Sequence, residues 1–120
     1  MATSNLSPVS IACNLGALTA EEQGRRATLA SRLRTCTQKV IETDTGYALR
    51  LPEEPAAYRE AFELALLERR CCPFLRLELT LESGHGPVWL TLGGAPGVKA
   101  FLAVSSLIDR QSTETRPCCS

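Results

Sequence analysis

A regular alternation of apolar and polar residues between Leu75 and Leu81 places the strongest constraint on the fold. Leucine occupies every second position, and charged or threonine side chains fill the positions between. Because successive side chains of a strand point to opposite faces, the segment is predicted to be a strand with one apolar face. A glycine-containing turn at 83–87 follows, and alternation at 88–92 predicts a partner strand. We expect the four leucines to be buried beneath helices.

The rest of the chain predicts a second hairpin and three helices. Thr19 and Glu22 have the spacing of a capping box at a helix start, and Pro55 suits the first turn of another helix. Gly46 supplies the turn of the second hairpin. The predicted elements are an extended run at 9–13, a helix at 19–36, strands at 40–43 and 47–51, a helix at 55–72, strands at 75–82 and 88–92, and a helix at 98–109.

This order predicts a single α+β domain over residues 1–109, followed by a polar tail at 110–120 that carries a terminal cysteine pair. Two hairpins and three helices most simply form one antiparallel four-stranded sheet with the helices packed on one face. At 120 residues, the chain has the length of one ordinary domain.

Charge and hydropathy argue against several classes of partner. The 13 basic and 13 acidic side chains balance, so we expect no nucleic-acid binding. No stretch approaches about 18 consecutive apolar residues, so we expect no membrane span. Residues 1–14 lack a charged start and a long apolar region, so we expect no secretory signal and a cytoplasmic location.

Six cysteines are the feature with distinctive chemistry. Four of them form two adjacent pairs, Cys71-Cys72 and Cys118-Cys119, and vicinal disulfides are strained. The cytoplasm also keeps thiols reduced. The sequence therefore predicts free thiols and no disulfide framework.

The first of these pairs is the leading candidate site. It lies at the end of the predicted helix, where Pro73 disfavours helical backbone at Cys72 and could let both sulfurs face one pocket. Helical periodicity places Glu68 and Arg69 toward the buried side, so Glu68 needs a cationic partner, either Arg69 or an arginine of the first helix. Arg69 and Arg70 favour a thiolate, whereas the helix C-terminus disfavours it.

Two or three thiolates suit soft ions such as Hg(II), Cu(I), Zn(II) or trivalent arsenic and antimony. We therefore predict a metal or metalloid site with Cys71 and Cys72 as primary ligands. Cys13, or the tail cysteines Cys118 and Cys119, could add further sulfurs. Structural zinc is poorly supported because the chain has no C-x-x-C pair.

Three other interpretations remain open. The cysteines, Cys36 above all, could simply pack the core of a non-catalytic interaction module that binds a protein partner or a second copy through the face carrying Trp89. Cys71 and Cys72 could instead form a redox switch. Catalysis ranks last, because the single histidine, His85, lies in a glycine-flanked turn and no nucleophile–base pair can be assembled.

The segment Glu68-Arg69-Arg70-Cys71-Cys72-Pro73-Phe74 resembles a motif in a family of short bacterial proteins of unassigned function. The likeness continues through 75–79, 86–90 and 97–102, and covers roughly residues 11–102. Members of this family are associated with heavy-metal-resistance settings. The resemblance implies such a setting and supplies no catalytic residues.

Overall fold

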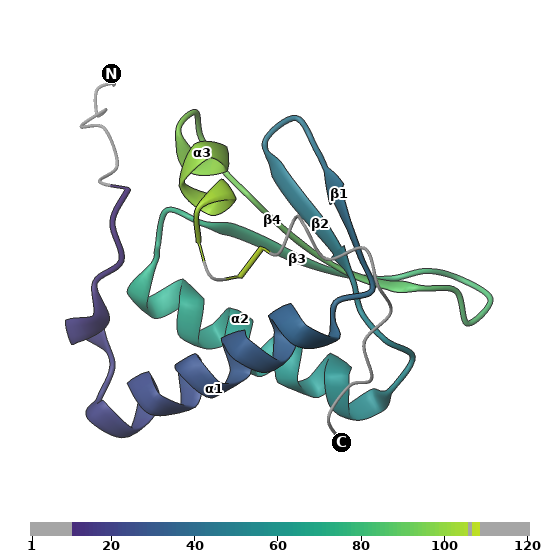
Figure 1. The fold of residues 1–120 in the computed structure, drawn as a ribbon, viewed down its shortest axis with the longest axis horizontal. Coiled ribbons are helices and arrows are strands. Elements are labelled where there is room, and N and C mark those ends of the chain that lie inside the picture. Colours follow the sequence, from purple (N-terminus) through teal and green to yellow (C-terminus); the bar gives the residue numbers. More distant parts are fainter. Residues whose placement is uncertain (1–10, 106, 109–120) are drawn as a thin grey trace.

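The computed structural model describes residues 11–105, 107 and 108, and shows an α+β domain in which helices pack against one face of a four-stranded antiparallel sheet (Figure 1). The elements in chain order are η1 (Leu15–Ala17), α1 (Ala20–Cys36), β1 (Lys39–Glu42), β2 (Gly46–Arg50), α2 (Pro55–Cys71), β3 (Arg76–Leu81), β4 (Val88–Gly93) and α3 (Val98–Ala103). The predicted fold class is confirmed. The predicted boundary between residues 109 and 110 lies outside the described residues.

The two hairpins join through their second strands, which gives the strand order β1-β2-β4-β3. Leu90 of β4 lies opposite both Leu49 of β2 and Leu79 of β3. Leu49, Leu90 and Leu79 therefore form one row across the sheet on the face that the helices cover, and neighbouring rows on that face add further apolar side chains. Those buried on β2 and β4 are Tyr47, Leu49, Val88, Leu90 and Leu92.

The leucines of β3 lie on the same face of the sheet but are less buried than predicted. Leu77 and Leu79 are partly buried, whereas Leu81 is 65% exposed. Their orientation agrees with the prediction, because Arg76, Glu78 and Thr80 between them are exposed. The predicted burial of Leu81 is wrong, because β3 is an edge strand and the core is centred on β2 and β4.

Helix α1 begins with the predicted capping box, since Glu22 N–H donates to Thr19 Oγ1 and Thr19 N–H donates to Glu22 Oε1. Ion pairs then join α1 to α2 in opposite order along the two helices, which shows that the helices are antiparallel. These pairs are Glu22–Arg70, Arg26–Glu68 and Arg32–Glu60.

Two predicted boundaries differ from the structure. Helix α3 ends at Ala103 and not near residue 109, and Ser105 Oγ donates to Leu102 O just after its last turn. Such side-chain bonds compete with continuation of a helix. Residues 11–13 form no strand, and positions 9 and 10 of the predicted extended run lie outside the described residues. None of the described helices is long and apolar enough to span a bilayer.

A candidate thiol site at the end of helix α2

Three buried side chains meet at the last turn of α2. One oxygen of Glu68 and the sulfurs of Cys71 and Cys72 all lie within 4.8 Å of one another. Cys72 is the residue that caps the helix, and its N–H donates to Glu68 O at 2.6 Å. With φ −130° and ψ 68°, Cys72 has left the helical conformation, as the following Pro73 requires. The helix break therefore brings both sulfurs to one place, and these residues could hold a metal ion.

Cys13 reaches the same place from the other end of the chain. It is disulfide-bonded to Cys72, which is 59 positions away in sequence, and the two Cα atoms lie 4.8 Å apart. Its neighbour Asn14 donates its N–H to Cys71 O at 2.6 Å. Cys13 is exposed, whereas Cys71 and Cys72 are fully buried. Residues 11–14 therefore form a covering segment over the site.

The prediction of free thiols is wrong for Cys13, Cys36 and Cys72, each of which is disulfide-bonded. It rested on compartment and on the strain of vicinal bridges, and neither argument can reveal that the fold places Cys13 against Cys72. Cys71 keeps a free thiol, and its sulfur lies 3.6 Å from the Cys72 sulfur. The site thus joins one disulfide and one thiol in direct contact.

Arg26 of α1 is the cationic partner of Glu68. Its Nε and Nη2 donate to Glu68 Oε2 and Oε1 at 3.0 and 2.9 Å, so the guanidinium holds both oxygens of the carboxylate. This confirms that an arginine of the first helix partners Glu68. Cys72 Sγ lies 3.8 Å from Glu68 Oε1. Sequence reasoning could name the helix but not the position, because the pairing depends on how α1 and α2 align.

Arg69 and Arg70 lie away from this contact. Both are exposed, contrary to the prediction that Arg69 faces the buried side. Arg70 donates to Glu22 Oε2 at 2.6 Å and to Ala17 O at 3.0 Å, and so ties the end of α2 to the start of α1. The arginine that acts on the pKa of the Cys71 thiol is Arg26.

Burial raises the pKa of the Cys71 thiol above its ordinary value of 9.0, and the negative charge of Glu68 raises it further. The Arg26 guanidinium acts in the opposite direction and lowers it, but the net shift is upward. Cys71 therefore carries its proton at neutral pH. A ligand that needs the Cys71 thiolate must displace that proton.

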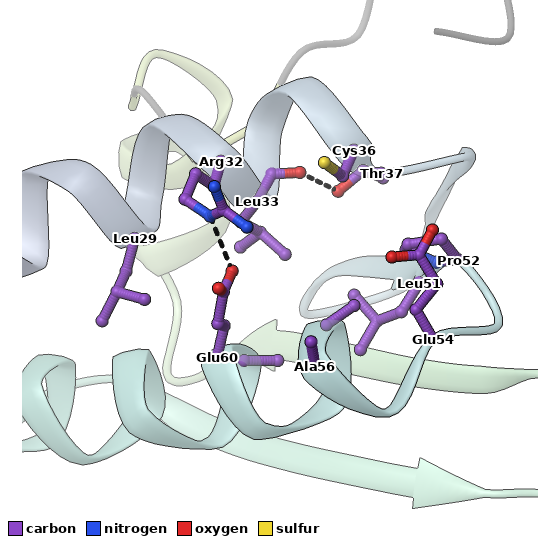
Figure 2. Close-up of a pocket in the computed structure, with 12 residues that line it drawn as sticks. Leu29, Arg32, Leu33, Cys36, Thr37, Leu51, Pro52, Glu54, Ala56 and Glu60 are labelled. Atoms are coloured by element: carbon purple, nitrogen blue, oxygen red, sulfur yellow. Dashed lines mark hydrogen bonds and ion pairs between the residues drawn. The ribbon is translucent and has the colours of Figure 1, made fainter. Parts of the chain in front are cut away.

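A separate cavity of about 190 Å³ lies between α1 and the first half of α2 (Figure 2). Leu29, Leu33 and Cys36 of α1 line one side. At its edge Arg32 Nε donates to Glu60 Oε1 at 2.8 Å, and Thr37 Oγ1 donates to Leu33 O at 2.7 Å. Sequence reasoning predicted burial of Cys36 but not this cavity, because a void depends on how side chains meet across two helices.

The remaining candidates fall at the surface or beyond the described part of the chain. Trp89 is partly buried on the sheet face opposite the helices, beside an open hollow that Ile41 and Thr91 also line. His85 lies in the turn between β3 and β4, with a positive φ of 57°. Cys118 and Cys119 lie outside the described residues.

Comparisons with known proteins identify no relative of this chain. No protein-family model, no curated protein and no solved structure matches this chain. The resemblance to short bacterial proteins stays a prediction, and the function must be argued from the site.

Proposed function

We propose that this protein binds a soft metal or metalloid ion through Cys13, Cys71 and Cys72 once the Cys13–Cys72 disulfide is reduced. The observation that carries the proposal is the convergence of three sulfurs, two buried at the end of α2 and one brought from 59 positions away. Thiolates select soft ions over magnesium and calcium, which prefer oxygen ligands. The proposed role is capture or sequestration and includes no catalytic step.

Because Arg26 already holds Glu68, the site favours an ion that needs only three sulfur ligands. Both carboxylate oxygens are held by Arg26, so binding an ion through Glu68 would disrupt a buried ion pair. Structural zinc takes four ligands, whereas trivalent arsenic or antimony is satisfied by three sulfurs. Arsenite is therefore the preferred probe, and Hg(II) is the second.

The binding reaction has a defined balance. Reduction of Cys13–Cys72 takes two electrons and two protons, supplied by an external pair of thiols that become a disulfide. Arsenous acid then exchanges its three hydroxyl groups for three sulfurs, and each hydroxyl group leaves with one thiol proton, so that three waters are released. The disulfide form cannot bind in this way, because two of the three sulfurs are bonded to each other.

A redox role is the second candidate, and the Cys13–Cys72 bond itself favours it. With Cys71 Sγ 3.6 Å from Cys72, thiol–disulfide exchange has a nearby attacking sulfur, although the raised pKa of Cys71 slows it at neutral pH. The two roles share one oxidised state and differ in what the reduced state does. The heavy-metal-resistance setting that the family resemblance implies favours ion capture.

Native mass spectrometry of the reduced chain with arsenite tests the proposal. We expect a mass gain of one arsenic less three hydrogens, which identifies three sulfur bonds; a two-sulfur adduct would keep a hydroxyl group. Replacing Cys13, Cys71 or Cys72 singly by serine should abolish the three-sulfur adduct. The matched control replaces both Cys118 and Cys119 by serine and should retain it.

Loss of the adduct in the control, or its survival in the Cys72→Ser variant, would overturn the proposed ligand set. Equilibration of the disulfide with a glutathione redox buffer tests the second candidate separately. A bond that stays oxidised at the reducing glutathione poise of the cytosol would be a structural crosslink and not a switch.

A further inference from the structure

Strand β3 has a free edge. It pairs with β4 on one side, and within residues 11–105, 107 and 108 no strand pairs with its other side. The turn that joins β3 to β4 projects beyond the helices (Figure 1). An exposed edge of this kind presents unpaired backbone N–H and C=O groups and is a template for another strand.

The side chains of this edge offer contacts on both faces. On the helix side, Leu77 and Leu79 are partly buried and Leu81 is 65% exposed. On the opposite face, Arg76, Glu78, Thr80 and Glu82 form a polar row. Glu82 extends that row beyond the strand, because its N–H donates to Pro87 O across the hairpin. Arg76 and Glu78 form an exposed ion pair at 2.9 Å.

We propose that this edge pairs with the same edge of a second copy, antiparallel and centred on Leu79. A two-fold axis at Leu79 places Leu79 opposite itself and Leu77 opposite Leu81 of the other copy. It also places Arg76 opposite Glu82 twice, and Glu78 opposite Thr80. Apolar and opposite-charge pairs across neighbouring strands both stabilise a sheet. The exposed Leu81 gains a leucine partner, and the two sheets become one of eight strands.

The neighbouring registers are less favourable. A two-fold axis at Glu78 or at Thr80 would oppose glutamates, either Glu78 with itself or Glu78 with Glu82, and directly opposed like charges destabilise a sheet. An axis at Leu77 pairs Arg76 with Glu78 but extends past the start of β3 toward Pro73, which has no N–H to donate. That axis also leaves Leu81 uncovered.

The other edge of the sheet is a weaker site for self-association. Strand β1 has only four residues, Lys39–Glu42, so a symmetric antiparallel pair that keeps like faces together opposes three positions at most. Glu42 is also bonded to Lys99 of α3 at 2.7 Å. The length and charge pattern that suit a second copy are therefore found at β3.

Sedimentation analysis of the full chain under reducing conditions tests the proposal, since reductant removes disulfide-linked dimers. We expect reversible dimerisation at protein concentrations up to about 100 µM, as suits a small interface. Glu82→Arg should weaken dimerisation about tenfold or more, because it opposes Arg76 with a like charge. Arg76→Glu should do the same, and the double exchange should restore the dimer.

Glu78→Arg is the matched control, because it changes the same charge on the same face but opposes Thr80. It should retain the dimer. A monomeric wild-type chain at the highest concentration would overturn the proposal. Failure of the double exchange, or equal loss from Glu78→Arg, would overturn the register centred on Leu79. Circular dichroism of each variant establishes that it is folded, and none of these changes touches the thiol site.

Discussion

Replacing Arg26 by methionine should cost more stability than any other single ion-pair change in the described structure. The side chain of Glu68 is 1% exposed, and Arg26 holds both of its carboxylate oxygens. Methionine keeps much of the length of the arginine side chain but removes its charge and its donors. The carboxylate would then be buried without a counter-charge.

The magnitude follows from the penalty for a buried unpaired charge, which is about 3–5 kcal/mol when one partner of such a pair is removed. A domain of 120 residues has a total stability of roughly 6–18 kcal/mol. The change would therefore remove a large share of the free energy of unfolding. Replacing both Arg26 and Glu68 by methionine should recover most of the loss, because an apolar pair leaves no unpaired charge.

Urea unfolding of the oxidised protein measures this effect, with the single tryptophan, Trp89, as the fluorescent probe. Arg25→Met is the matched control, because Arg25 is the adjacent residue and its ion pair with Glu63 is about half exposed. That change should leave the stability nearly unchanged. A loss below about 1 kcal/mol in Arg26→Met would refute the argument, since it would mean that the unpaired carboxylate reaches water or another donor.

Two further predictions concern the sulfurs. Cys13→Ser should lower the stability of the oxidised protein by about 4 kcal/mol, because the bond closes a long loop across 59 positions. The difference between denaturant melts with and without reductant should shrink in this variant by the same amount, and what remains is due to the disulfide of Cys36. Because the pKa of Cys71 is raised above 9.0, its proton is held more tightly in the folded state. The contribution of the protonated Cys71 thiol to the free energy of unfolding is therefore complete below the ordinary thiol pKa. It is lost as the pH rises through the raised pKa. The difference in free energy of unfolding between wild type and Cys71→Ala, followed from about pH 7 to pH 10, measures this loss, and a pH-independent difference would contradict it.

The fold was predictable because its elements have strong local signals. The leucine alternation of β3, the capping box at Thr19 and Pro55 at the start of α2 each identify an element without knowledge of the others. The exposure of Leu81 was not predictable, because edge and centre strands show the same alternation and only the strand order separates them.

The site was predictable only in part, because its members come from separate elements. The helix break at Pro73 correctly located the buried pair Cys71 and Cys72. The bond from Cys13 depends on how the chain before α1 crosses the end of α2, and the choice of Arg26 depends on how α1 and α2 align. No local pattern in the sequence records either arrangement.

The covering segment at residues 11–14 has a consequence for the order in which sulfurs would engage an ion. Cys13 is exposed while Cys71 and Cys72 are enclosed, so under the proposed function an ion arriving from solvent would meet Cys13 before the other two sulfurs. Release would follow the reverse path, and the backbone hydrogen bond from Asn14 N–H to Cys71 O would resist lifting of the segment. Capture would then be fast and stepwise, and the residence time of the bound ion would be set by how often four residues of backbone lift from the end of a helix.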